Sequence, residues 1–466
     1  MVYVALSHRW GGKKSILQLT SQTLPVLLHG FSLDVLPKTF QDTIHICRKL
    51  GYRYLWIDSL CIIQDSIQDW QKEATSMGSV YGNCAWSLAA VHGKDSDAGC
   101  FSERNPLRYQ HCSLPTDPPL VACLEGRSSR YHLPDEIPSE VPLLERGWVF
   151  QECLLSPKTV YFGARGVSWE CRTAVADDTF YNTSEPQKQL TFAKTKMQFD
   201  KIRRYECNID SRADFLEAWF HVVKQYSTTS LTVQTDRLIA FSGIIAAVQE
   251  RTRLTPFFGM WKEALVEELL WKVLPTQRLH RLGNYRAPSF SWTSIDSSID
   301  HIQPNGQTPW RYSHILRMED WNRTEEIFER GQAGYIAQIL DTGLLEPRYC
   351  LEQVPEGYIT IFGDVADAKL HNDDYYIPRM WFGDQWRCEY KTGVASKSAK
   401  AWLDASEWQQ DEMQVLLLTI YYQGSYSRDV TGLILRPSPS GSNLYQRIGV
   451  FENGTMSGKP REVKII

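Results

Sequence analysis

The sequence predicts an α/β N-terminal domain with a mainly parallel sheet, then a helical middle region and a β-rich C-terminal region. In the first part, short apolar strand patterns alternate with helix patterns, which favours a parallel sheet covered on both faces. The middle part has apolar residues at a period near 3.6, and the last part has short β-rich runs broken by Gly, Pro and Asn. We therefore expect three regions, at 1–175, 176–285 and 286–466.

The elements follow from apolar spacing and from end signals. The helix pattern at 37–51, for example, has a proline at its start and a glycine at its stop. In the N-terminal region we expect strands at 2–7, 52–58, 85–91, 158–162 and 167–171, and helices at 37–51, 66–83 and 146–156. Further helices are expected at 214–227, 235–250 and 259–274, a loop around Pro288, and strands at 357–365, 413–423, 430–439, 446–454 and 461–466.

Composition excludes several classes of protein. A chain of 466 residues with 43% hydrophobic and 22% charged residues is globular, and its net charge of −4 gives no whole-chain signal for nucleic acid. No apolar run reaches the roughly 18 residues that span a bilayer. The 11 cysteines include no Cys-x-x-Cys pair, which argues against a zinc site. We expect a cytoplasmic protein without a bound metal, a nucleic-acid partner or a membrane span, and an upstream segment before residue 1.

The turn after the first strand, "SHRWGGKKS" (7–15), could hold a phosphate. It is not a Walker loop, because Ser7 stands where that motif needs its first glycine. Backbone N–H groups of the turn, with the cations His8, Arg9, Lys13 and Lys14, could still bind a phosphate at the carboxyl edge of the sheet. The alternative is a tight turn with solvated basic residues.

Asp58 directly follows the strand expected at 52–58. Ligands of open α/β sheets bind beyond the carboxyl ends of the strands, where such a carboxylate could accept hydrogen bonds from ribose hydroxyls. The alternative is that Asp58 caps the loop or pairs with an arginine.

Glu152 interrupts the apolar helical run "RGWVFQECLLS" (146–156), four residues after Trp148. On a helix these two side chains lie on one face. Either this face is the solvent-exposed side of an amphipathic helix, or the indole and the carboxylate line a ligand site. Burial beside an indole would disfavour the charged carboxylate unless Arg146 or a ligand compensates.

Three blocks of the sequence resemble the signature blocks of the fungal heterokaryon-incompatibility (HET) domain, in that family's order. They are "YVALSHRWGG" (3–12), "YLWIDSLCIIQDSIQDWQKEATSMGSVYGNCAW" (54–86) and "RGWVFQECLLSPKTVYF" (146–162). The resemblance implies a role in non-self recognition that triggers regulated cell death, with an incompatibility partner protein.

HET domains are similar to TIR domains, which implies a flavodoxin-like fold for the N-terminal domain. Some TIR domains cleave NAD⁺ with a glutamate in a Trp-Cys-x-x-Glu motif, and Trp148 and Glu152 have that spacing, with Val149 in place of the cysteine. The resemblance thus implies Glu152 as the catalytic residue and NAD⁺ as the substrate. Ser7, Trp10, Gly11, Asp58 and Trp148 would then bind the nucleotide. The alternative function is a non-catalytic module that signals by self-association.

Overall fold

The structure is a computed structural model, and it includes most of the helices and strands expected from the sequence. The described residues are 1–11, 17–103, 112–114, 120–122, 143–164, 166–177, 191–204, 209–274, 285–302, 314–315, 334–335, 337–344, 356–372, 386–392, 395–404, 412–422, 430–441, 443–454 and 458–466. The chain forms two compact units, so a stretch from the middle of the sequence belongs to the first unit. Unit 1 consists of Met1–Arg204 and Thr229–Glu250, and unit 2 of Tyr205–Thr228 and Arg251–Ile466.

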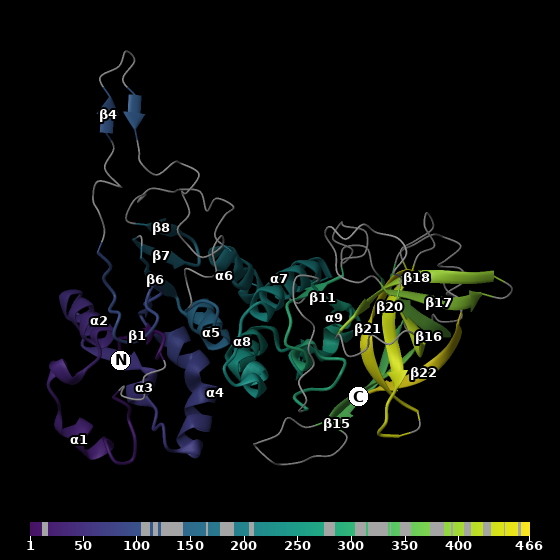
Figure 1. The fold of residues 1–466 in the computed structure, drawn as a ribbon, viewed down its shortest axis with the longest axis horizontal. Coiled ribbons are helices and arrows are strands. Elements are labelled where there is room, and N and C mark those ends of the chain that lie inside the picture. Colours follow the sequence, from purple (N-terminus) through teal and green to yellow (C-terminus); the bar gives the residue numbers. More distant parts are fainter. Residues whose placement is uncertain are drawn as a thin grey trace. The chain divides into compact units, whose positions relative to one another are not determined.

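Unit 1 contains a sheet of six strands in the order β2-β1-β3-β6-β7-β8 (Figure 1). Its strands are β1 (Tyr3–Ser7), β2 (Tyr54–Ile57), β3 (Trp86–Ala89), β6 (Lys158–Phe162), β7 (Val167–Cys171) and β8 (Val175–Asp177). The first four run parallel, whereas β7 and β8 pair antiparallel. The sheet is therefore mixed, and the expectation of a mainly parallel sheet holds for its first four strands. A separate hairpin joins β4 (Cys112–Leu114) and β5 (Leu120–Ala122).

Helices cover both faces of this sheet, as the apolar strands predict. Along β1, Val4 and Leu6 belong to one hydrophobic cluster with Phe40 of α2 (Lys38–Lys49). Ala5, which points to the other face, packs with Met77 of α4 (Ile67–Asn83). On that second face α5 (Gly147–Leu155) also packs against β3 and β6, and Figure 1 shows α2 and α4 on opposite sides of the sheet.

The helix boundaries follow the sequence signals. α2 begins after Pro37, and Gly51 just beyond its end has φ +78°, a conformation that glycine adopts without strain. α4 begins after Ser66, whose side chain accepts a hydrogen bond from the Asp69 N–H. The other helical elements of unit 1 are α1 (Leu24–His29), η1 (Leu33–Val35), α3 (Asp58–Cys61), α6 (Thr191–Arg203), η5 (Gln234–Asp236) and α8 (Arg237–Thr252, whose last two residues fall in unit 2).

Unit 2 begins with α7 (Ile209–Ser227) and continues mainly as strands. Short elements come first: β9 (Pro256–Phe257), β10 (Met260–Trp261), η6 (Lys262–Ala264), α9 (Leu265–Glu268), β11 (Trp271–Val273), η7 (Trp292–Ser294) and β12 (Ile299–His301). A ten-stranded sheet follows, composed of β13 (His314–Ile315), β14 (Gly334–Tyr335), β15 (Gln338–Leu344), β16 (Gly357–Asn372), β17 (Trp386–Thr392), β18 (Ala395–Leu403), β19 (Glu412–Tyr422), β20 (Val430–Pro437), β21 (Leu444–Gly454) and β22 (Lys459–Ile465). Helices in the middle and a β-rich C-terminal region were both predicted.

The long strand β16 closes a circle of pairings in this sheet. Its first half pairs with β22 and its second half with β19. The circle is completed by the pairs β19–β20, β20–β21 and β21–β22. Apolar residues of β16, β18, β19, β20 and β21 form one buried cluster.

The prediction of one continuous helix at 259–274 is wrong, because only η6 (Lys262–Ala264) and α9 (Leu265–Glu268) are helical and strands flank them on both sides. Gly259 has φ +81° and creates a turn between β9 and β10, and β11 pairs with β12 instead of continuing a helix. The Glu268 carboxylate also fastens this segment locally, because it accepts hydrogen bonds from Trp261 N and from Trp219 Nε1. Apolar residues recur here because the segment is buried on nearly every side, which produces the same spacing as an amphipathic helix.

Among the described residues, no helix combines the length and the apolar character that crossing a membrane requires. The cysteines with described side chains, Cys47, Cys61, Cys84, Cys100, Cys153 and Cys171, are free thiols.

Candidate functional site

Two strand ends bring the predicted polar residues together in unit 1. Ser7 is the last residue of β1, and Asp58 directly follows β2. β1 and β2 are parallel neighbours, with Leu6 opposite Ile57, so Ser7 and Asp58 are the next positions in register. The site therefore lies at the carboxyl edge of the sheet, where open α/β sheets bind ligands.

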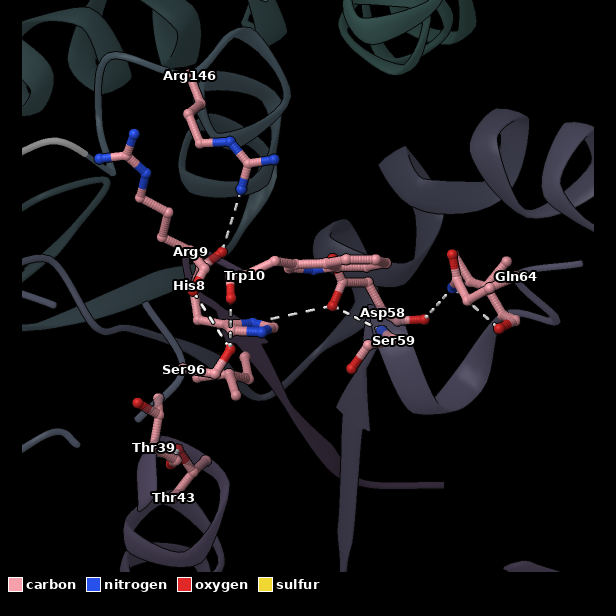
Figure 2. A network of polar contacts seen from close by, with 12 residues as sticks. His8, Arg9, Trp10, Thr39, Thr43, Asp58, Ser59, Gln64, Ser96 and Arg146 are labelled. Carbon is pink, nitrogen blue, oxygen red and sulfur yellow. Dashed lines mark hydrogen bonds and ion pairs between the residues drawn. The ribbon is translucent and has the colours of Figure 1, made fainter. Parts of the chain in front are cut away.

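Asp58 organises the turn that follows β1. Its Oδ2 accepts a hydrogen bond from Trp10 Nε1 at 2.7 Å, and its Oδ1 accepts one from the Ser59 N–H at 2.7 Å. His8 Nδ1 lies 3.8 Å from Oδ1 (Figure 2). Asp58 thus caps its own loop, one of the two roles expected for it, and the predicted contact with ribose stays a prediction.

Glu152 reaches the same place from α5. Its side chain is buried, with 6% of the residue exposed. Burial, with a smaller contribution from the negative charge of Asp58, raises its pKa to about 7, against the opposing effects of the Ser7 hydroxyl, the positive charge of Arg146 and the Tyr81 hydroxyl. Glu152 is therefore close to half ionised at neutral pH.

Tyr81 of α4 completes this group. Its hydroxyl donates a hydrogen bond to Leu6 O at 2.9 Å, which ties α4 to the end of β1. Burial and the charge of Glu152 raise the pKa of Tyr81 well above its usual value, so the hydroxyl is neutral. The hydroxyl is also within hydrogen-bonding reach of Glu152, and it favours the ionised carboxylate when it donates there instead of to Leu6 O.

Several buried polar atoms here have no hydrogen-bond partner among the described residues. They are Ser7 Oγ, both ring nitrogens of His8 and Ser59 Oγ. The three residues are at most 4% exposed. Buried polar groups in native proteins are nearly always paired, so a cluster of unpaired ones suits a site that a polar ligand completes.

Arg146 provides the positive charge of the site. Its guanidinium donates a hydrogen bond to His8 O at 3.3 Å, as Figure 2 shows. Burial lowers the pKa of His8; the charge of Asp58 opposes this effect and that of Arg146 adds to it. His8 is therefore neutral near pH 7. Among the described residues, Arg146 is the cation whose charge acts on both His8 and Glu152.

Residues 3–152 match the family described as Heterokaryon incompatibility protein (HET). This chain contains a HET domain. No curated protein and no solved structure matches the chain. The matched residues run from β1 to Glu152 and include every residue predicted for the site.

Trp148 of α5 in the HET domain lies one turn before Glu152 and is half-buried, packed against the cluster that includes Met77 and Tyr81. Its ring meets Trp70 of α4 edge-on, with centroids 6.4 Å apart. Its N–H bonds to the carboxylate of Asp236, a contact that lowers the pKa of Asp236 against the larger effect of burial. These protein contacts occupy the N–H and part of the ring, and stacking on a nucleotide stays a prediction.

Gly11 follows Trp10 in the turn of the HET domain and has φ +81°. A Cβ at this position would lie 2.4 Å from Asp95 Cβ, so the close approach of the chain to Asp95 requires glycine. The predicted phosphate-binding residues Lys13 and Lys14 lie outside the described residues.

The sequence did not single out Tyr81 for this site, and it placed His8 only among the cations expected to bind a phosphate, whereas the ring is buried and neutral. Tyr81 lies in a helix whose other polar residues face solvent, and its hydrogen bond to Leu6 O joins residues 75 positions apart. His8 packs edge-on against Phe40, with centroids 4.9 Å apart. Nothing local marks either residue, because their partners are distant in the sequence. Among the described residues, no group of three or more His, Cys, Asp or Glu side chains could hold a metal ion.

Proposed function

We propose that this chain acts in fungal heterokaryon incompatibility, where recognition of non-self leads to regulated cell death, and that its HET domain hydrolyses NAD⁺. The first part rests on the family match at residues 3–152. The second rests on one observation: Glu152 is buried without an ion pair among the described residues, beside Asp58 and unpaired polar groups. A carboxylate kept in so costly an environment is a candidate functional group.

The charge of the site fits the proposed substrate. The nicotinamide ring of NAD⁺ is positively charged, and the carboxylates of Asp58 and Glu152 favour a cation beside them. As the N-glycosidic bond breaks, positive charge moves to the ribose, which becomes oxocarbenium-like. The ionised Glu152 stabilises that charge, and nicotinamide leaves as a neutral ring without a general acid. Water then adds to the ribose carbon and loses a proton, giving ADP-ribose.

The polar groups of the site have different roles in this proposal. The His8 ring nitrogens have no protein partner among the described residues and can hydrogen-bond the ribose hydroxyls, as can the Ser7 hydroxyl by turning away from Glu152. Asp58 holds Trp10, and with it the turn that closes over the strand ends. Tyr81 keeps part of Glu152 ionised at neutral pH.

The test measures free nicotinamide after incubation of the purified full chain with NAD⁺ at high protein concentration. Glu152→Gln keeps the shape of the side chain and removes its charge, and we expect release to fall about 100-fold or more. Glu103→Gln, which changes an exposed carboxylate of unit 1, is the matched control and should leave release unchanged. NADH, whose ring is neutral, should not be hydrolysed. Equal rates for wild type and Glu152→Gln would exclude this role.

A different observation favours self-association as a second candidate. Helix α1 has no buried residue, and apolar side chains on and after it are exposed: Val26 64%, Leu28 78%, Phe31 42% and Val35 58%. A second copy of the chain could cover this surface. Sedimentation velocity of a Leu28→Ser, Phe31→Ser variant tests this idea, with Met197→Ser, at an exposed position of α6, as the control. A monomeric wild type at high concentration would exclude it.

A further inference from the structure

The helix that carries Glu152 is held by residues 229–250, a segment that we name the brace. At the start of α5, Ser230 O accepts a hydrogen bond from the Gly147 N–H at 2.9 Å, and the Ser230 N–H donates to Glu145 O at 2.7 Å. The approach is close, because a Cβ on Gly147 would lie 2.8 Å from the Leu231 side chain. The brace therefore fixes where α5 begins.

Two further contacts join the brace to side chains of α5. Asp236 of the brace bonds to the N–H of Trp148. One turn later, Gln151 Oε1 accepts a hydrogen bond from the Gly243 N–H of α8 at 2.8 Å. Gln151 is fully buried and directly precedes Glu152. The contacts with the brace thus run along α5 from its first residue to the one before Glu152.

The brace also sets the spacing between α5 and α4. Gly243 crosses Gly78 of α4 so closely that a Cβ on Gly243 would lie 2.8 Å from Gly78 Cα and 2.5 Å from Gln151 Oε1. Tyr81 follows Gly78 by less than one turn on α4. The crossing therefore lies next to both residues that meet at the end of β1, Tyr81 and Glu152.

We propose that the brace is the positioning element of Glu152, and that the HET domain is incomplete as a functional unit without it. The brace lies outside the matched residues 3–152, and the chain before it and after it belongs to unit 2. The catalytic part of this proposal rests on the proposed function. Its structural part, that Glu152 loses its buried setting when the brace shifts, does not.

The experiment changes the crossing in the full chain with Gly243→Ala. The added methyl group must move either the Gln151 amide or the α4 backbone. Gly82→Ala is the matched control, because a Cβ at this other helical glycine meets nothing within 4 Å. Asp236→Ala, which removes the acceptor of Trp148, is a second variant in case Gly243→Ala does not fold.

Two readouts are independent of activity. Hydrogen exchange of peptides covering Gly147–Leu155 should be faster in both brace variants and unchanged in Gly82→Ala. The stabilising effect of Glu152→Gln at pH 8, measured by urea unfolding, should shrink in the Gly243→Ala background because Glu152 becomes hydrated. Nicotinamide release should also fall, by about 10- to 100-fold.

The outcomes separate the two proposals. Unchanged exchange of α5 and an unchanged effect of Glu152→Gln in both brace variants would overturn the positioning role, whatever the activity. If the wild type releases no nicotinamide, the proposed function fails, and the exchange and unfolding measurements still decide the role of the brace.

Discussion

Two buried glutamates of unit 1 have opposite electrostatic surroundings. Glu170 on β7 is fully buried, and its Oε1 accepts a hydrogen bond from Tyr161 at 2.7 Å and forms an ion pair with Lys196 at 3.2 Å. Lys196 also donates to Thr159 Oγ1 at 3.2 Å. Glu152 on α5 is almost as deeply buried and has no ion pair among the described residues.

The difference distinguishes a carboxylate whose buried charge the fold compensates from one whose charge it does not compensate. At Glu170, a lysine from α6 compensates the buried charge and ties that helix to the sheet. At Glu152, burial raises the pKa to about 7, so the fold carries a group that it stabilises poorly when it is charged. A group that destabilises the folded state is expected where a ligand or a transition state uses it.

The largest expected effect comes from breaking the compensated pair. Lys196→Met leaves the Glu170 charge buried without a cation, and we expect a loss of about 3–5 kcal/mol in the free energy of unfolding. Urea unfolding followed by far-UV circular dichroism measures it. Adding Glu170→Leu should restore much of the loss, because the charge itself is then gone. A single variant no less stable than the double variant would contradict this view of the pair.

Removing the Glu152 carboxylate should raise the free energy of unfolding, whereas breaking the Lys196–Glu170 pair should lower it. The pKa of Glu152 is about 7 in the folded chain, above the ordinary value of 4.5, so the folded state holds a proton that the unfolded state has released between these pH values. Stability therefore falls as pH rises from about 4.5 to 7, by up to about 3 kcal/mol. Glu152→Gln removes this penalty.

Glu152→Gln should accordingly raise the free energy of unfolding by about 1–3 kcal/mol at pH 8, with little difference near pH 4.5. Urea unfolding at both pH values measures the change, with Glu103→Gln as the exposed control. A variant that is less stable than wild type at pH 8 would mean that Glu152 is stabilised in the fold as Glu170 is.

The sequence was enough to place the residues at the strand ends, but it was not enough to predict which side chains bury Glu152 beside them. Ser7 and Asp58 could be placed because a polar residue at the end of a buried strand must lie at the carboxyl edge of a parallel sheet. Glu152 was recognisable as a carboxylate in an apolar helix, but its burial depends on Tyr81 and on the brace, which are distant in the chain.

Local sequence patterns also failed to predict two other features, an ion pair in unit 1 and the structure of residues 259–274. The Lys196–Glu170 pair joins an ordinary lysine of a polar helix to an ordinary glutamate of a strand, and neither position carries a signal. The apolar spacing at 259–274 predicted a helix, although Gly259 and the Glu268 carboxylate fold that segment otherwise. Periodicity reports which residues are buried, and a segment buried on all sides satisfies several periods at once.

The smallest expected effects come from the two tyrosines. Tyr161→Phe removes a hydrogen bond to the ionised Glu170 and should cost about 1.5–3 kcal/mol, whereas Tyr81→Phe removes one to a neutral carbonyl and should cost about 0.5–1.5 kcal/mol. Urea unfolding of the two variants at pH 7 tests this order.

Tyr81→Phe should have a second consequence that Tyr161→Phe lacks. The Tyr81 hydroxyl favours the ionised form of Glu152, so its removal raises the pKa of Glu152 further. The pH at which half of the stabilising effect of Glu152→Gln has developed should therefore move upward in the Tyr81→Phe background. In the Tyr161→Phe background that pH should stay where it is in wild type. A shift of equal size in both backgrounds would show that the two glutamates share one electrostatic environment, and the contrast between them would then fail.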